Sequence, residues 1–148
     1  MNDEQLKQIL REFDLKVTKV RLCVLDLLLQ SRIAMSHSQI TDALEAFELD
    51  KVTLYRTLNT FVEVGLAHKV ATDERNWLYA IYSEDVQQHN HQHEHHESPH
   101  AHFICEACDK IYCFPIEEKQ IDLKKAELEG FSIKQHEIRL HGTCPVCK

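Results

Sequence analysis

Apolar side chains in the first half of the chain recur every three or four residues, the spacing that places them along one stripe of an α-helix. One stripe covers residues 6–13 and another covers residues 40–47. Between them, residues 20–29 are almost all apolar, which predicts a central, buried helix. The first half of the chain is therefore expected to be mainly helical up to about residue 65.

Capping residues indicate where two of these helices begin. Ser36 followed by Gln39 forms a capping box for a helix that should end near Phe47. Asp50 can cap the next helix, which Gly65 should terminate. Because a turn of about three residues would join the two, the sequence predicts a helix-turn-helix.

After residue 65 the pattern becomes that of β-strands. Residues 66–71 and 77–82 are rich in branched and aromatic side chains and flank a polar stretch, which predicts a hairpin. A helix-turn-helix followed by a hairpin is a winged helix. The residue pattern of the second half of the chain predicts strands over 102–105 and 111–114, a helix over 117–129 and a strand over 131–140. The fold class is therefore mixed α/β (α+β).

Composition divides the chain into two domains. Residues 84–99 contain a single apolar residue and have almost nothing to bury. We predict a winged-helix domain over 1–84, a His-rich linker over 85–99 and an α/β domain over 100–148. A domain of fewer than about 70 residues rarely has a sufficient core, so the second should need a metal ion, a partner subunit or both.

Charge and cysteine content narrow the functional classes. The net charge of −7 argues against wholesale wrapping of nucleic acid, although a local basic face remains possible. No apolar run approaches the roughly 18 residues needed to span a bilayer, and the N-terminus lacks a signal-peptide profile, so we expect a cytoplasmic protein. Six cysteines in that compartment indicate metal or redox chemistry rather than disulfides.

The second helix of the predicted helix-turn-helix offers groups that could contact DNA. If Leu54, Leu58 and Phe61 face inward, polar side chains in its first half project outward. Arginine can pair with guanine or hold a phosphate, and tyrosine and threonine can contact phosphates or a thymine methyl. The predicted DNA-binding residues are Lys16, Arg21, Thr53, Tyr55, Arg56 and Thr57. A solvated helix face that touches no DNA is the alternative.

Two Cys-x-x-Cys pairs give the strongest local signal in the chain. They are Cys105 with Cys108 and Cys144 with Cys147. Each pair can supply two corners of a tetrahedron, and four thiolates complete a structural Zn²⁺ site with no open position for catalysis. Four thiols without a metal ion, or a redox-active pair, are the alternatives.

A second metal site is expected near the start of the α/β domain. His100 and His102 lie two residues apart on an expected strand, so their side chains share a face. Cys113 ends the next strand, and imidazole with thiolate favours zinc over calcium, magnesium or manganese. The alternative for Cys113 is a packed thiol.

Several segments resemble the ferric uptake regulator family of bacterial metal-dependent repressors. They are residues 15–28 (LKVTKVRLCVLDLL), 52–66 (VTLYRTLNTFVEVGL), 102–114 (HFICEACDKIYCF), 130–144 (GFSIKQHEIRLHGTC) and the closing CPVC. The resemblance implies a winged-helix DNA-binding domain, a dimerisation domain and a structural four-cysteine zinc. It also implies a second metal site that organises a homodimer for operator binding. It implies neither an enzyme nor a protein with a membrane or small-molecule partner.

Within that family, residues 65–80 look most like the zinc-uptake regulators, in which a histidine after the Gly-Leu pair is a sensor ligand. Here that histidine is His68. Cys113 replaces a glutamate of the family's hinge site, and Ala80 and Ala101 replace acidic residues of the iron- and peroxide-sensing branches. Our hypothesis for the sensor ligands is therefore the set His68, His100, His102 and Cys113.

The predicted function is a zinc-responsive repressor that binds double-stranded operator DNA as a dimer. An iron-, manganese- or peroxide-responsive regulator is the alternative within the family. A zinc-storage or metallochaperone protein is the alternative from another class, in which the histidines of residues 89–96 hold metal loosely. Storage predicts several weakly bound ions and no specific operator.

Overall fold

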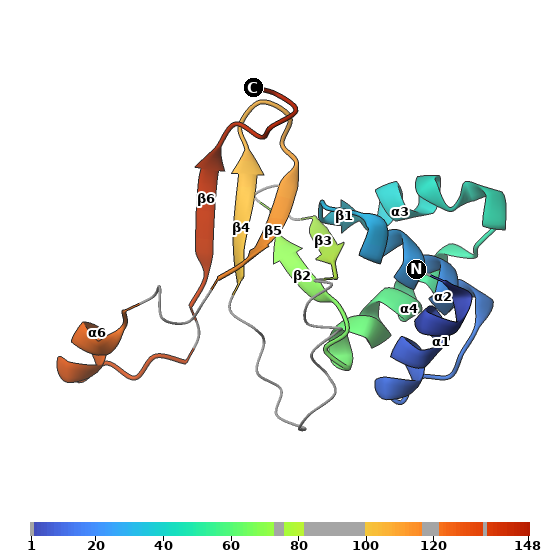
Figure 1. Cartoon of the computed structure of the whole chain (residues 1–148), viewed down its shortest axis with the longest axis horizontal. Helices are drawn as coiled ribbons and strands as arrows, with labels where there is room; N and C mark the ends of the chain where they lie inside the picture. The colour runs from blue at the N-terminus through green and yellow to red at the C-terminus, as the bar shows by residue number, and fades with distance from the viewer. Residues whose placement is uncertain (1, 73–75, 82–99, 117–121, 135) are drawn as a thin grey trace. The chain divides into compact units, whose positions relative to one another are not determined.

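The computed structural model describes residues 2–72, 76–81, 100–116, 122–134 and 136–148 of the chain (Figure 1). The chain divides into two compact units, Met1–His95 and His96–Lys148, and each is described by itself. The predicted linker over 85–99, with its histidines and both of its boundaries, lies outside the described residues.

The predicted helices of the N-terminal unit are all present. They are α1 (Asp3–Glu12), α2 (Lys19–Gln30), α3 (His37–Ala43) and α4 (Lys51–Glu63). The Ser36 hydroxyl accepts the backbone N–H of Gln39 at 3.1 Å, and the Asp50 carboxylate accepts that of Thr53 at 2.9 Å. Gly65 follows α4 with a φ of 77°, a left-handed conformation that favours glycine. The predicted caps of α3 and α4 are therefore confirmed.

The helix-turn-helix prediction was wrong about the connection between its two helices. α3 ends at Ala43, and a 3₁₀ helix, η1 (Glu45–Phe47), follows it, so seven residues, 44–50, separate α3 from α4. Because η1 has a tighter winding than an α-helix, Phe47 does not continue the buried stripe of α3. Its side chain is 44% exposed and lies beneath the ammonium of Lys19.

One hydrophobic core joins these helices. The side chains with essentially no exposed surface are Leu10, Val24, Leu25, Leu28, Ile40, Leu54, Leu58 and Phe61. α2 contributes three of them, as expected for the central helix, and Cys23 on the same helix packs at the edge of the core. This core fixes the rotation of α4 and so decides which of its side chains remain exposed.

A small antiparallel sheet completes the N-terminal unit. β2 (His68–Ala71) and β3 (Trp77–Ala80) form the predicted hairpin with tighter limits, and β1 (Met35–Ser36) pairs with the other edge of β3. The sequence pattern did not predict β1, because two residues are too few to show alternation. The helices and this hairpin together form the predicted winged helix.

The C-terminal unit contains a three-stranded sheet in the order β5-β4-β6. β4 (His100–Cys105) pairs antiparallel with β5 (Ile111–Pro115) and parallel with β6 (Ile138–Gly142). A short helix, α6 (Lys124–Leu128), precedes β6. No helix in the described part of the chain has the length and apolar content to cross a membrane.

Two limits predicted for this unit were wrong. Residues 131–134 are exposed and pair with no strand among the described residues, so the last strand begins at Ile138 rather than at residue 131. The predicted helix over 117–129 is helical at Lys124–Leu128 only among its described residues, and residues 117–121 lie outside them. The apolar pattern alone did not predict where the last strand begins, because a strand also needs a neighbouring strand with which to form hydrogen bonds.

We expect Leu54→Ala to destabilise the N-terminal unit by about 2–5 kcal/mol, because it leaves a cavity under the middle of the core. The check is urea denaturation followed by the helical circular dichroism signal. Val52→Ala, on the same helix but at a side chain that is 56% exposed, should change stability by less than about 0.5 kcal/mol. Equal losses for the two variants would contradict this core.

Candidate metal centre and nucleic-acid interface

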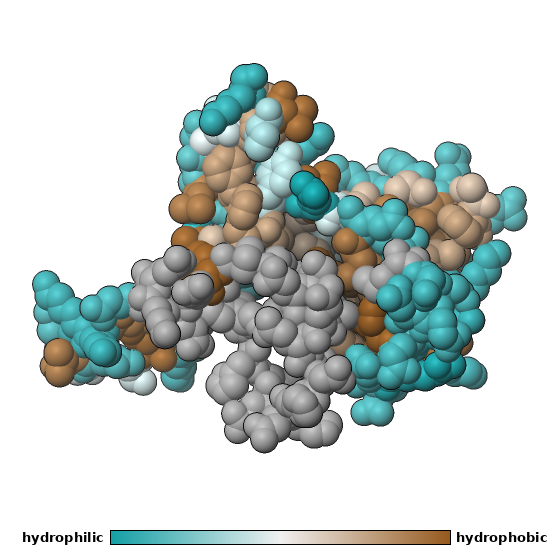
Figure 2. Space-filling view, in the orientation of Figure 1, coloured by the Kyte–Doolittle hydropathy of each residue, from teal (hydrophilic) through white to brown (hydrophobic). Residues whose placement is uncertain are grey.

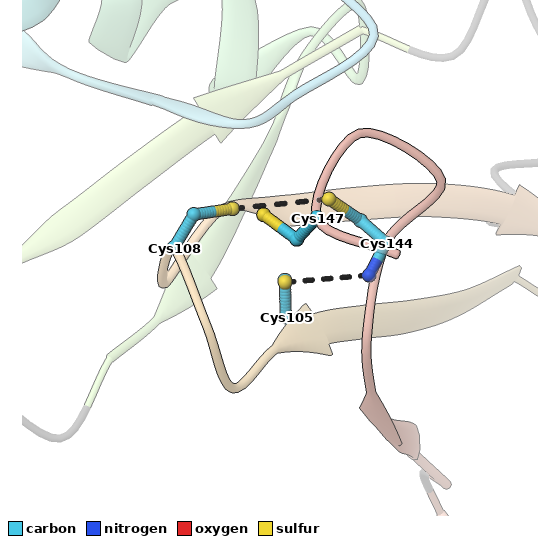
Figure 3. Close-up of side chains that lie close together, drawn as sticks. All are labelled: Cys105, Cys108, Cys144 and Cys147. Atoms are coloured by element: carbon cyan, nitrogen blue, oxygen red, sulfur yellow. Dashed lines mark hydrogen bonds between the residues drawn. The ribbon is translucent and has the colours of Figure 1, made fainter.

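Two parallel strands bring the four cysteines of the predicted structural site together. Cys105 is the last residue of β4, and Cys108 lies in the turn that follows it. Cys144 and Cys147 lie in the segment after β6. Because β4 and β6 run in the same direction, with Cys105 opposite Gly142, both pairs emerge at the same edge of the sheet (Figure 3).

The sulfur positions fit a tetrahedral metal ion. All four Sγ atoms lie within 4.8 Å of one another, and those of Cys108 and Cys144 are 3.9 Å apart. Four Zn–S bonds of about 2.3 Å require sulfurs that are about 3.8 Å apart. The backbone N–H of Cys144 donates to the Cys105 sulfur at 3.3 Å, which stabilises a thiolate there. The geometry and the donor atoms both suit a closed thiolate site.

Hydrogen bonds at the cluster lower the pKa of some of its thiols and raise the pKa of others. The Tyr112 hydroxyl donates to the Cys144 sulfur and lowers the pKa of Cys144 to about 6. The pKa of Cys147 is raised to about 12, first by its hydrogen bond with Cys144. Some sulfurs therefore favour thiolates while their neighbours retain protons. A divalent cation would displace these protons, because thiolates are the metal-binding form.

Three of the predicted sensor ligands lie on one face of the C-terminal sheet. His102 and Cys113 are paired across β4 and β5, and His100 lies two residues before His102 on the same strand. The His100 and His102 rings meet edge to face, with centroids 4.8 Å apart. The prediction that these histidines share a face is confirmed, and the sheet register adds Cys113 beside them.

Burial shapes the chemistry of this face. His102 is only 6% exposed, and burial lowers its pKa, which favours the neutral imidazole that binds metals. Burial also raises the pKa of Cys113 to about 11, so a cation that binds its sulfur must displace a proton. Glu137, which the sequence did not single out, places a carboxylate oxygen 3.8 Å from Nδ1 of His102 while it also bonds Arg139.

His68, the fourth predicted sensor ligand, belongs to the N-terminal unit. It is the first residue of β2, where it is half-buried and pairs with Ala80. Ala80 and Ala101, which stand where the family's other branches carry acids, are both buried. Neither position offers an oxygen ligand.

The exposed side of α4 carries three of the six predicted DNA-binding residues. Thr53, Tyr55 and Arg56 are exposed, while Leu54, Leu58 and Phe61 are fully buried, as predicted. Their places in the helix explain this, because the exposed residues lie on the side opposite the core stripe.

Before α2, Lys16 is exposed and Arg21 is half-buried. The Arg21 guanidinium donates to the Lys16 carbonyl at 2.8 Å, which holds the chain leading into α2. That both residues contact the DNA backbone remains a prediction.

Thr57 was wrongly predicted to project outward. It is 6% exposed, because it lies three residues after Leu54 and four before Phe61, on the buried stripe of the helix. The contact of His37 with α4 was not predicted either. Nε2 of His37 lies 3.3 Å from the Lys51 carbonyl and its ring 6.2 Å from that of Tyr55, a contact between two helices that no local pattern predicts.

Comparison with known proteins adds an independent line of evidence. Residues 12–141 match the profile described as the ferric uptake regulator family. The ferric uptake regulation protein of Haemophilus ducreyi is 30% identical over 152 residues, covering 97% of this chain and 91% of the relative. That of Campylobacter upsaliensis is 31% identical over 150 residues, covering 97% and 87%.

Solved structures show the same fold. A zinc uptake regulator complexed with zinc and DNA aligns with a TM-score of 0.67 and 26% identity, covering 97% of this chain and 91% of the other. The Vibrio cholerae ferric uptake regulator aligns with a TM-score of 0.63 and 23% identity, covering 93% and 98%. The similarity spans both units of the chain.

We expect Cys144→Ser to remove the tetrahedral thiolate site, because it deletes one of the four ligands, the sulfur that hydrogen-bonds Cys108, Cys147 and Tyr112. Titration of the metal-depleted chain with Co²⁺, followed by sulfur-to-metal charge-transfer absorption, would measure this loss. Cys23→Ser is the matched control, since Cys23 lies in the other unit, on α2. A wild-type spectrum from the Cys144 variant would contradict the site.

Proposed function

Because the chain belongs to the ferric uptake regulator family of metal-responsive transcriptional regulators, we propose that it is a zinc-responsive repressor that binds operator DNA as a homodimer. The members of this family are regulators and not enzymes. Family membership also favours regulation over metal storage. The observation that carries the choice of zinc is the donor set of the C-terminal sheet, which consists of sulfur and imidazole nitrogen.

The four-cysteine cluster is assigned to a structural Zn²⁺. Its sulfur spacing matches tetrahedral zinc, and a shell of four thiolates leaves no position for an exchangeable ligand. A metal ion bound by the cluster would link the turn after β4 to the segment after β6 and so would stabilise the fold of this unit.

The sensor site is assigned to His68, His100, His102 and Cys113. Support comes from the shared face of His100 and His102 and from the cross-strand pairing of His102 with Cys113. Three nitrogens and one sulfur favour zinc over manganese, which prefers oxygen ligands. Glu137 is assigned to orienting His102, since its carboxylate is already held by Arg139 at 2.9 Å.

Metal loading would affect DNA binding because the assigned ligands come from both units. His68 belongs to the winged helix and the other three ligands to the C-terminal unit. A metal ion bound by such a ligand set restricts the motion of one unit relative to the other. A dimer whose units are restricted in this way can hold its two copies of α4 at the spacing of successive major grooves.

A second copy of the chain is the proposed partner of the C-terminal sheet. The face opposite His102 carries Phe103, Tyr112, Phe114 and Leu140, with Phe114 and Leu140 almost half exposed. Figure 2 shows hydrophobic side chains on the surface over β4 and β6. An exposed apolar sheet face of this kind is typical of a protein interface.

An iron-responsive regulator is the second candidate. It is favoured by the relatives, since those with 30% and 31% identity are both called ferric uptake regulation proteins. The zinc uptake regulator that aligns at 26% identity, bound to zinc and DNA, supports the first candidate. The two candidates differ in the metal that tightens DNA binding.

We expect zinc, and not Fe²⁺ or Mn²⁺, to tighten operator binding at buffered free concentrations far below micromolar. Fluorescence anisotropy of a labelled promoter fragment from the protein's own locus, with a chelator control, measures this directly. Tightening by Fe²⁺ alone would establish the second candidate. Specific binding that ignores every metal would contradict both.

We expect Cys113→Ser to abolish the zinc dependence of operator binding while leaving the four-cysteine zinc in place, because it removes the only sulfur of the sensor set. Metal analysis after chelator dialysis should show about one zinc ion retained per chain. Cys23→Ser, which changes a packed thiol outside either ligand set, should keep the wild-type response. A normal zinc response from Cys113→Ser would exclude Cys113 as a sensor ligand.

A further inference from the structure

The β2–β3 hairpin carries a lysine whose ammonium lies close to two aromatic rings. Lys69 pairs with Tyr79 across the hairpin and Ala71 pairs with Trp77, so Lys69, Tyr79 and Trp77 share one face. The Lys69 ammonium lies 5.4 Å from the centre of the Trp77 ring and 6.0 Å from that of Tyr79. Trp77 is 52% exposed, whereas Tyr79 is buried. The cation and the indole therefore form the outer part of this face.

This face continues toward the exposed side of α4. Tyr79 packs in the core of the N-terminal unit, and the nearby Tyr55 hydroxyl adds to the effect of burial in raising the pKa of Tyr79. Tyr55 itself is 52% exposed, and the centre of its ring lies 6.2 Å from that of His37. Aromatic groups thus link the start of α3, α4 and the hairpin.

Within the described residues, no carboxylate forms a salt bridge with the Lys69 ammonium. A cation–π contact orients the ammonium but leaves its charge in place. The site therefore offers an anion one oriented cation beside a flat apolar ring, which matches a phosphate joined to a deoxyribose.

We propose that Lys69 and Trp77 form a second DNA contact, in which the hairpin grips the phosphate backbone beside the groove entered by Tyr55 and Arg56. This inference rests on the proposed function, because it requires that the chain bind duplex DNA. Lys69 supplies charge to a phosphate, and Trp77 packs against the adjoining sugar. Contacts of this class set register and orientation on the duplex without reading sequence.

Trp77 is the only tryptophan in the chain, so its fluorescence reports on this contact without labelling. We expect saturating operator DNA to lower the acrylamide quenching constant of the zinc-loaded, full-length protein by about half, since the exposed ring becomes covered. Acrylamide is uncharged, so the DNA does not repel it. An unchanged quenching constant in the fully bound complex would overturn the proposal.

A charge substitution provides the second measurement. Lys69→Gln should reduce the slope of log affinity against log salt by about one for each bound chain, and Lys69→Arg should retain it. Lys134→Gln is the matched control, because Lys134 is an exposed lysine of the other unit. Thermal unfolding of each variant verifies that the hairpin is intact.

The outcomes separate this inference from the proposed function. Normal operator binding with an unprotected Trp77 and an unchanged salt slope would refute the hairpin contact alone. A wild-type chain that binds no operator under any metal condition would refute both. A protected Trp77 together with the reduced slope of Lys69→Gln would establish the contact.

Discussion

The parallel pairing of β4 with β6 is the constraint on which the C-terminal unit depends. Only five described residues of this unit are buried, and two of them, Cys105 and Cys144, belong to the cysteine cluster. So small an apolar interior contributes little free energy of folding. Pairing the strands in parallel places both cysteine pairs at one edge, where a metal ion can supply the missing stabilisation. The same pairing leaves an apolar face exposed, so the proposed metal binding and subunit association would both compensate for the small core.

The N-terminal unit follows a different principle, because its stability comes from ordinary packing. Its helices and hairpin bury one continuous apolar core, and the chemistry is carried by what that core leaves outside. Tyr55 and Thr57 illustrate this: they are two residues apart on α4, but one is half exposed and the other buried. A rotation of α4 by one residue would exchange them. The core therefore determines which side chains are available to DNA.

The net charge of the chain affects how it can bind DNA. A net charge of −7 opposes nonspecific binding to nucleic acid, so attraction must come from a few placed cations. Arg56 on α4 and Lys69 on the hairpin are cations of this kind, and both lie in the unit that carries the exposed helix. An acidic protein with a small cationic surface favours binding at sites where shape and base contacts add to the charge.

The sequence by itself determined the presence of the N-terminal helices and their caps, the hairpin and the cysteine cluster. Helix caps and apolar spacing are local properties, and Cys-x-x-Cys pairs bring two ligands together wherever they occur. Only the tertiary structure decided what depends on distant neighbours. The start of β6 at Ile138 depends on pairing with β4, and the burial of Thr57 depends on how α4 packs. The placement of Cys113 beside His102 depends on the register of two strands, because a shift of one residue would turn that side chain to the opposite face.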